Sequence, residues 1–267
     1  GWKHPSDMVQ EGSPFFGTTP AEINKALNVP GYFDPWSMRN MRLASAADAP
    51  APRTAGDPLA MRAAYTSGHV FTGRLDVPAI DHRQYLEREL DMHNSHQSFA
   101  VRQRVLHKMG DSDNLVVWFT DTMPGTPKAS QSMQALDVMD QWLANMRRHP
   151  GRGIAGNKPA DAVDACFDLQ GQRMSAGPRV WSGILDNRPA GACTQAFPLY
   201  GTSRTVAGAP IEGGIYRCAL KPVDRALHDG TYGNSAPTAQ QVEQLKRIFP
   251  QGVCDYTRPD QARPPAG

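Results

Sequence analysis

The segment from residue 58 to residue 148 alternates between helix-like and strand-like stretches, and this alternation constrains the fold more than any other feature. Leu115–Thr120 (LVVWFT) is a continuous β-branched and aromatic run, which predicts a strand covered on both faces. Residues 75–81 (LDVPAID) predict a second strand, in which Pro78 indicates an edge position or a strand start. Helices are predicted at 58–68, 96–109 and 130–148. Strands separated by helices predict an α/β fold, with parallel strands and helices packed against them.

The helix predicted at 130–148 carries the clearest apolar pattern of the chain. Its apolar residues recur at intervals of three and four, which predicts one face turned to the core. These residues are Met133, Leu136, Met139, Leu143 and Met146, with Trp142 beside them.

Composition and charge place the chain among ordinary globular proteins. Its 267 residues are 40% hydrophobic and 20% charged, and they suffice for one large domain or two small ones. A net charge of +2 gives no reason to expect a nucleic-acid partner. No apolar run approaches the roughly 20 residues that cross a bilayer, so no membrane span is predicted.

The distribution of proline and glycine residues divides the chain into three parts. Residues 1–57 are predicted to be a loop-rich N-terminal segment, residues 58–149 the α/β segment, and residues 150–267 an irregular C-terminal extension. The extension includes one clear helix, where Thr238 and Gln241 form a predicted capping box.

All four cysteines lie in the last part, at Cys166, Cys193, Cys218 and Cys254. None forms a Cys-x-x-Cys pair, which argues against a zinc site and favours two disulfides in an oxidising compartment. Three pairings are possible, and four buried thiols are the alternative. We therefore expect a secreted or periplasmic protein. The chain starts at Gly1 without a signal-peptide pattern, which indicates a processed chain or a piece of a longer one.

The strongest candidate for chemistry is the sequence from Asp91 to His96 (DMHNSH), at the predicted start of a helix. A helix N-terminus favours negative charge and lowers the pKa of a nearby imidazole. Asp81 ends the preceding predicted strand, and ligands of α/β sheets bind beyond the carboxyl ends of strands. Asp91, His93, His96 and Asp81 are therefore candidates for a catalytic acid and base. The alternative is that Asp91 and its neighbours only cap the helix.

Other signatures are weaker or missing. His93 and His96 could bind a metal with Asp91, but they match no zinc-hydrolase pattern, so neither metal nor cofactor is predicted. Asp121 follows the best strand and is a second candidate carboxylate. The chain has no Gly-x-Ser-x-Gly nucleophile turn, no phosphate loop and no dinucleotide fingerprint.

Several segments, in this order along the chain, resemble a family of large secreted bacterial proteins related to the tannase and feruloyl-esterase type of α/β-hydrolase. They are 56–65 (GDPLAMRAAY), 77–86 (VPAIDHRQYL), 91–93 (DMH), 98–102 (SFAVR), 113–118 (DNLVVW), 139–143 (MDQWL), 158–166 (KPADAVDAC), 216–222 (YRCALKP) and 248–256 (IFPQGVCDY). The resemblance implies that this chain is the C-terminal portion of such a protein, with an α/β-hydrolase-like sheet and a disulfide-stapled extension. It also implies that the nucleophilic serine lies in an N-terminal half and that Asp91 and His93 match the family's Asp-x-His element.

These observations lead to two main hypotheses. The first is an extracytoplasmic hydrolase of carboxylic esters or related acyl bonds, acting on a small-molecule or polymeric ester. This chain would supply the acid and base, with His93 or His96 as the base. A second chain or a missing segment would supply the serine. The second is a non-catalytic accessory or binding subunit that keeps the C-terminal half of the fold. A metal-dependent enzyme centred on His93 and His96 is a third, weaker possibility.

Overall fold

The computed structural model describes residues 57–89, 95–200, 205, 208–232 and 236–263. These residues form two compact units. One spans 70–200, and the other combines the described residues before 70 with those after 200. The first unit thus extends 50 residues beyond the predicted boundary at residue 150. The predicted loop-rich segment 1–57 lies, apart from Asp57, outside the described residues.

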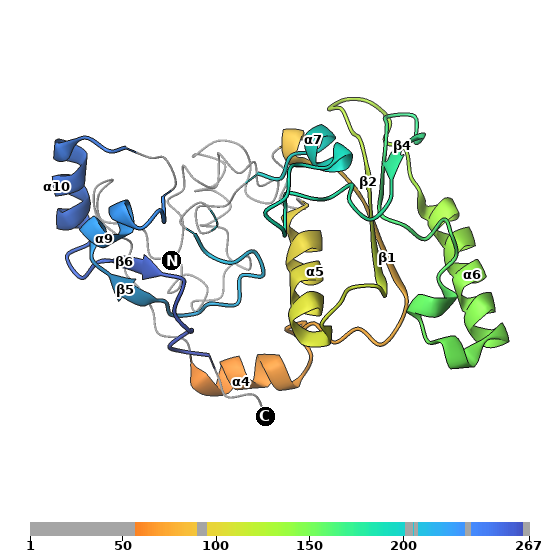
Figure 1. Cartoon of the computed structure of the whole chain (residues 1–267), viewed down its shortest axis with the longest axis horizontal. Helices are drawn as coiled ribbons and strands as arrows, with labels where there is room; N and C mark the ends of the chain where they lie inside the picture. The colour runs from red at the N-terminus through yellow and green to blue at the C-terminus, as the bar shows by residue number, and fades with distance from the viewer. Residues whose placement is uncertain (1–56, 90–94, 201–204, 206–207, 233–235, 264–267) are drawn as a thin grey trace, which may run out of the picture. The chain divides into compact units, whose positions relative to one another are not determined.

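The unit 70–200 is built on a four-stranded sheet (Figure 1). Its strands are β1 (Ala79–Gln84), β2 (Leu115–Thr120), β3 (Ala165–Phe167) and β4 (Arg173–Ala176), in the order β1-β2-β3-β4. The first three strands are parallel, with Ala79 opposite Leu115 and Trp118 opposite Ala165, and β4 is antiparallel to β3. This mixed sheet with flanking helices confirms the predicted α/β class.

Strand β1 begins later than the sequence predicted. It covers Ala79–Gln84 rather than 75–81. Pro78 has no N–H to donate, and the ladder starts just after it, where the Ala79 amide donates to the Asn114 carbonyl at 2.8 Å. The Leu75 carbonyl instead accepts from the Asn114 side chain at 2.9 Å. Pro78 therefore marks a strand start.

Helix α5 (His96–Met109) matches the predicted helix at 96–109. Phe99, Ala100 and Val105 of this helix are buried. Gly110 ends the helix with φ 88°, a conformation that glycine adopts without a Cβ clash, and its amide donates to the Leu106 carbonyl at 3.0 Å. A short 3-10 helix, η1 (Glu87–Glu89), lies between β1 and α5.

Helix α6 (Ser132–Arg148) forms as predicted, but a different face is buried. Ala135, Val138 and Trp142 are buried, whereas three residues of the predicted core stripe are exposed. These are Met133 at 70%, Leu136 at 64% and Leu143 at 38%. The predicted orientation of this helix was therefore wrong.

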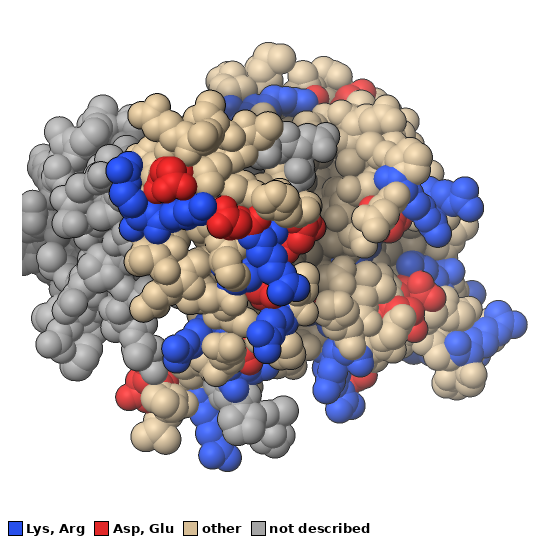
Figure 2. Space-filling view, turned by 60° about the vertical axis from the view of Figure 1, so that its left-hand side comes forward, with Lys and Arg blue, Asp and Glu red and all other residues tan. Residues whose placement is uncertain are grey.

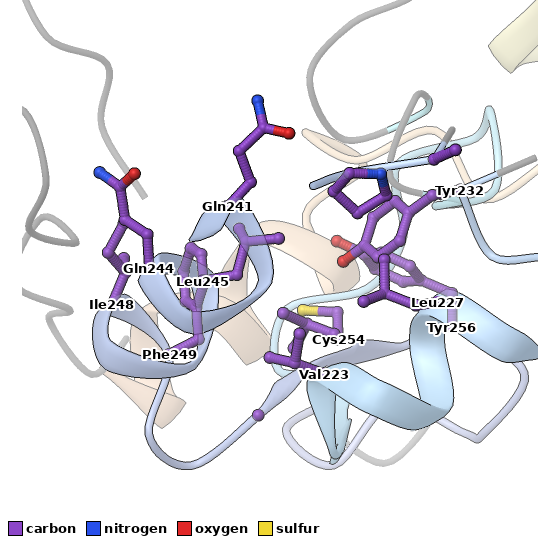
Figure 3. Close-up of a pocket in the computed structure, with 14 residues that line it drawn as sticks. Val223, Leu227, Tyr232, Gln241, Gln244, Leu245, Ile248, Phe249, Cys254 and Tyr256 are labelled. Carbon is purple, nitrogen blue, oxygen red and sulfur yellow. The ribbon is translucent and has the colours of Figure 1, made fainter. Parts of the chain in front are cut away.

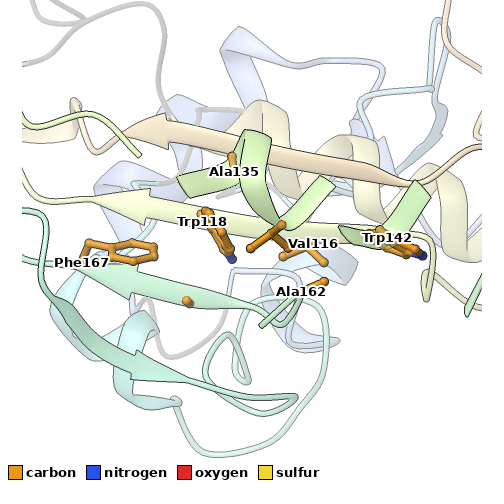
Figure 4. Packing of buried hydrophobic residues seen from close by; sticks show 8 residues of the cluster. Val116, Trp118, Ala135, Trp142, Ala162 and Phe167 are labelled. Carbon is orange, nitrogen blue, oxygen red and sulfur yellow. The ribbon is translucent and has the colours of Figure 1, made fainter. Parts of the chain in front are cut away.

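The buried face of α6 packs on one face of the sheet (Figure 4). The cluster consists of Val116, Trp118, Ala135, Val138, Trp142, Ala162, Ala165 and Phe167. Both α6 and the strands contribute small and large side chains to it, and the Trp142 indole donates to the Ile154 carbonyl at 2.9 Å. The buried and exposed sets both have helical spacing, so spacing alone could not select the face.

The other face of β2 is covered by aromatic side chains. Phe119 lies 5.6 Å from Phe99 of α5 and 4.7 Å from Trp181 between ring centroids. The Trp181 indole donates to the Val117 carbonyl at 3.2 Å. All six residues of β2 are buried, which confirms the prediction of a strand covered on both faces.

The rest of this unit is loops and short helices. These helices are η2 (Pro150–Arg152), η3 (Ala155–Asn157) and α7 (Ala192–Ala196). The disulfide Cys166–Cys193 joins β3 to α7.

The second unit contains an antiparallel pair of strands and three described helices longer than five residues. The strands are β5 (Ala219–Lys221) and β6 (Val253–Asp255), and the helices are α4 (Pro58–Thr66), α9 (Val223–His228) and α10 (Ala239–Ile248). The disulfide Cys218–Cys254 lies beside the strand pair, and the Thr238–Gln241 capping box begins α10 as predicted. Two disulfides are thus confirmed, and their pairing is 166–193 and 218–254.

Figure 2 shows acidic and basic side chains interspersed on the face in view, in keeping with the net charge of +2. Among the described helices, none has the length and apolar character that a bilayer crossing needs.

Candidate functional site

The candidate site lies at the carboxyl ends of the parallel strands. β1 ends at Gln84, β2 at Thr120 and β3 at Phe167, and parallel strands bring these ends to one edge of the sheet. Helix α5 leaves this edge and returns the chain to the start of β2, so its N-terminus lies at the same edge. This is where ligands bind in α/β sheets.

A buried carboxylate meets the N-terminus of α5. One oxygen of Glu87, Oε1, accepts hydrogen bonds from the Ser95 amide at 2.8 Å and from the Ser95 hydroxyl. Glu87 is 2% exposed and Ser95 is fully buried. The other oxygen, Oε2, is buried and has no hydrogen-bond partner among the described residues. A helix N-terminus stabilises such a negative charge, and a free buried lone pair is available to a further donor.

A second carboxylate follows β2. Asp121 accepts a hydrogen bond from Arg88 Nη1, and its Oδ1 also accepts from the Thr122 amide at 2.8 Å. Arg88 Nη1 donates to the Thr122 carbonyl at 3.1 Å as well. The Asp121 amide donates to the Phe167 carbonyl at 2.8 Å, which holds this residue beside the end of β3.

Two aromatic rings lie against the guanidinium of Arg88. Its guanidinium carbon lies 5.1 Å from the Tyr85 ring centroid and 6.0 Å from that of Phe197. The Tyr85 hydroxyl donates to the Pro198 carbonyl at 2.6 Å. Burial, together with the nearby Glu87 charge, raises the pKa of Tyr85 well above its ordinary value. This phenol therefore stays protonated at physiological pH and serves as a donor rather than a base.

Two of the four predicted site residues, Asp91 and His93, lie outside the described residues. His96 is the first residue of α5 and is half-buried, directly after the buried Ser95. Asp81 lies inside β1, opposite Val117 and three residues before the strand ends, and pairs with Arg83 at 3.5 Å. It therefore does not end the strand, as the predicted boundary at residue 81 implied.

The sequence did not single out Glu87 or Arg88. They belong to a charged run, Glu87-Arg-Glu89, which is typical of an exposed turn. Asp121 was found because it directly follows the strongest strand. Asp168, after β3, accepts from the amides of Gln170 and Gln172 and stabilises a turn. In the part of the chain that the structure describes, no three acidic, histidine or cysteine residues come together to hold a metal ion.

The fold and this edge together define an α/β protein with buried and paired carboxylates at the ends of its parallel strands. The chain belongs to the tannase-like family of unknown function (DUF6351), whose family model matches residues 14–265. This confirms the resemblance to tannase-related proteins. Comparison with curated proteins gives no significant match, and neither does comparison with solved structures.

Proposed function

We propose that this chain supplies the acid and base of an extracytoplasmic hydrolase that cleaves carboxylic esters or related acyl bonds. The nucleophilic serine would come from a missing segment or from a partner chain. The observation that carries the proposal is the position of His96. It opens α5 at the carboxyl edge of the sheet, next to the Glu87–Ser95 pair, in a chain of a tannase-like family.

The roles follow from the chemistry of acyl transfer. A histidine takes the proton of the attacking serine, and a carboxylate orients that histidine and stabilises its charged form. His93 or His96 is the base in this proposal, and Asp91 is the carboxylate. Glu87 is a positioning residue, because its hydrogen bonds to Ser95 hold the first turn of α5 in place.

The two disulfides support an extracytoplasmic location. Disulfides form and persist in oxidising compartments, and all four cysteines of this chain are paired in disulfides. Secretion or export to a periplasm is therefore part of the proposal.

Separate substitutions of the two histidines test the base. His93→Asn and His96→Asn should be introduced in the natural source, and each variant should be purified together with any second chain that accompanies it. Hydrolysis of a short-chain aryl ester is then measured. One of them should lower kcat by at least about 100-fold, the usual minimum for a lost general base. His107→Gln, at the other end of α5, is the matched control. Unchanged turnover in both site variants would rule out this assignment.

A non-catalytic accessory subunit is the second candidate, and one observation favours it. Ser95 is the described serine nearest the carboxylates of this edge in sequence, and it is fully buried with its hydroxyl bound to Glu87. It is therefore not placed to attack a substrate. Native mass spectrometry separates the two candidates. A co-purifying chain with a Gly-x-Ser-x-Gly turn supports the hydrolase, and a lone stable chain without ester turnover supports the accessory role.

A further inference from the structure

The second unit contains a cavity of about 840 Å³ (Figure 3). It lies between α9 and α10, with β6 and the residues on either side of it forming the remaining wall. This volume falls in the range of pockets that enclose organic small molecules. The cavity belongs to a different unit from the candidate site, so its use does not depend on the function proposed above.

The described residues that line the cavity include no charged side chain. Val223 and Leu227 of α9 face Leu245 and Ile248 of α10 across it, and Figure 3 shows these aliphatic groups on opposite sides. An ion placed in this cavity would lose hydration without gaining a countercharge from these walls, whereas an apolar body would gain from leaving water. The lining therefore selects for an uncharged occupant.

The polar side chains of the lining are Gln241, Gln244 and two phenols. Figure 3 shows the hydroxyl oxygens of Tyr232 and Tyr256 turned toward the side formed by α10. Burial, with smaller contributions from Tyr256 and Asp229, raises the pKa of Tyr232, so its phenol stays protonated. A neutral phenol donates a hydrogen bond, and the matching group on a ligand is an acceptor such as a carbonyl or ether oxygen.

A disulfide, an ion pair and a helix cap hold parts of the walls in place. Cys254, in the wall, is bonded to Cys218, and Lys246 of α10 pairs with Asp224 of α9 at 2.9 Å. The capping box of Thr238 and Gln241 holds the start of α10. A preformed pocket loses less conformational entropy on binding than a flexible one.

Helix α10 has an apolar face that the described residues leave half-covered. None of its residues is buried, although Val242, Leu245 and Ile248 share one side. A ten-residue helix is marginal by itself and depends on packing of that side. An occupant of the cavity would complete this packing.

We propose that this cavity is a binding site for an uncharged organic molecule that combines a ring or aliphatic body with a hydrogen-bond acceptor. The apolar walls take the body, and Tyr232 and Tyr256 take the acceptor. A peptide segment or a second copy of the chain is the competing occupant.

The test uses the full chain and a neutral fluorescent ketone, 6-propionyl-2-dimethylaminonaphthalene, whose emission reports an apolar environment. We expect saturable binding with one site per chain. Tyr232→Phe and Tyr256→Phe should each weaken it by about two- to tenfold, the size of one net hydrogen bond. Leu245→Lys should weaken it by at least about tenfold, because it places a charge in the cavity. Leu143→Lys, on an exposed site of α6, is the matched control and should change nothing.

A charged analogue separates selectivity from general stickiness. 1-Anilinonaphthalene-8-sulfonate should bind at least about tenfold more weakly than uncharged 1-anilinonaphthalene, and Leu245→Lys should remove this preference. Circular dichroism of each variant establishes that it is folded, and the two isosteric Tyr→Phe variants remain informative if Leu245→Lys does not fold. Absence of saturable binding, binding unchanged in the folded variants, or dimerisation that these variants abolish would overturn the proposal.

Discussion

The guanidinium of Arg102 on α5 binds both carboxylate oxygens of Asp164, with distances of 2.6 and 2.7 Å. Arg102 Nη2 also donates to the Leu115 carbonyl at 3.0 Å, and Asp164 Oδ1 accepts from the Val117 amide at 2.9 Å. The side chains are only 10% and 14% exposed. This pair therefore joins the helix to the start of β2 and to the segment that leads into β3, at the opposite end of these strands from the candidate site.

Replacing one partner of the Arg102–Asp164 pair should lower the stability of the protein strongly. Arg102→Met leaves a carboxylate without its partner in a protected place, and we expect it to lower the free energy of unfolding by about 3–5 kcal/mol. The double variant Arg102→Met/Asp164→Leu should lose less than the sum of the two single variants, because no charge then remains unpaired. Urea denaturation of the four proteins measures this coupling.

The exposed pair Arg74–Asp76 is the control for this experiment. Its side chains are 73% and 55% exposed, and Asp76→Asn should change stability by less than about 1 kcal/mol. Equal losses in the buried and exposed pairs would contradict a structural role for Arg102.

The orientation of α6 gives a second prediction. Trp142→Ala removes a fully buried side chain and its bond to Ile154, and should cost about 3–5 kcal/mol. Leu143→Ala, one residue further and 38% exposed, should cost less than about 1 kcal/mol. Thermal or chemical unfolding of both variants checks this, and the reverse ranking would restore the face predicted from the sequence.

Each disulfide should stabilise its own unit. The closed loops span 27 residues for Cys166–Cys193 and 36 for Cys218–Cys254, which predicts about 3.5–4 kcal/mol from restriction of the unfolded chain in each case. Paired Cys→Ala variants, followed by denaturation, measure the loss. The 218–254 variant should also weaken binding of the neutral probe, because Cys254 lines the cavity, whereas the 166–193 variant should leave it intact.

The stability of the protein should fall at low pH as the carboxylate of Asp229 becomes protonated. Hydrogen bonds from Lys221 and then from Thr231 lower the pKa of Asp229 from 3.8 to about 2. A carboxyl whose pKa is lower in the folded state stabilises the protein at any pH above 3.8, and this contribution disappears as the pH falls through about 2. Asp229→Asn should therefore lower Tm at pH 6, and the difference from the wild type should close between pH 4 and pH 2. A difference that stays constant down to pH 2 would contradict this role.

Local sequence patterns were sufficient to predict an element where the pattern allowed only one structural environment. Leu115–Thr120 has no polar face, so a strand covered on both sides was the only consistent prediction. The Thr238–Gln241 capping box was predictable because its hydrogen bonds join residues three apart. The number of disulfides, but not their pairing, followed from four well-spaced cysteines, and the family followed from segments along most of the chain.

Tertiary structure decided what depends on partners distant in the sequence. Two apolar sets on α6 have the same period, and only the packing of Ala135 and Val138 in one cluster with residues of the sheet selected the buried set. Glu87 resembles a solvent-exposed glutamate until the chain folds and the start of α5 covers it. The pairing of Arg102 with Asp164 spans 62 residues, and no local pattern encodes it. The sequence thus determined the helices and strands and the chemistry of their side chains. Packing determined which faces are buried and which charges pair, because burial and ion pairing depend on contacts between segments rather than on any one segment.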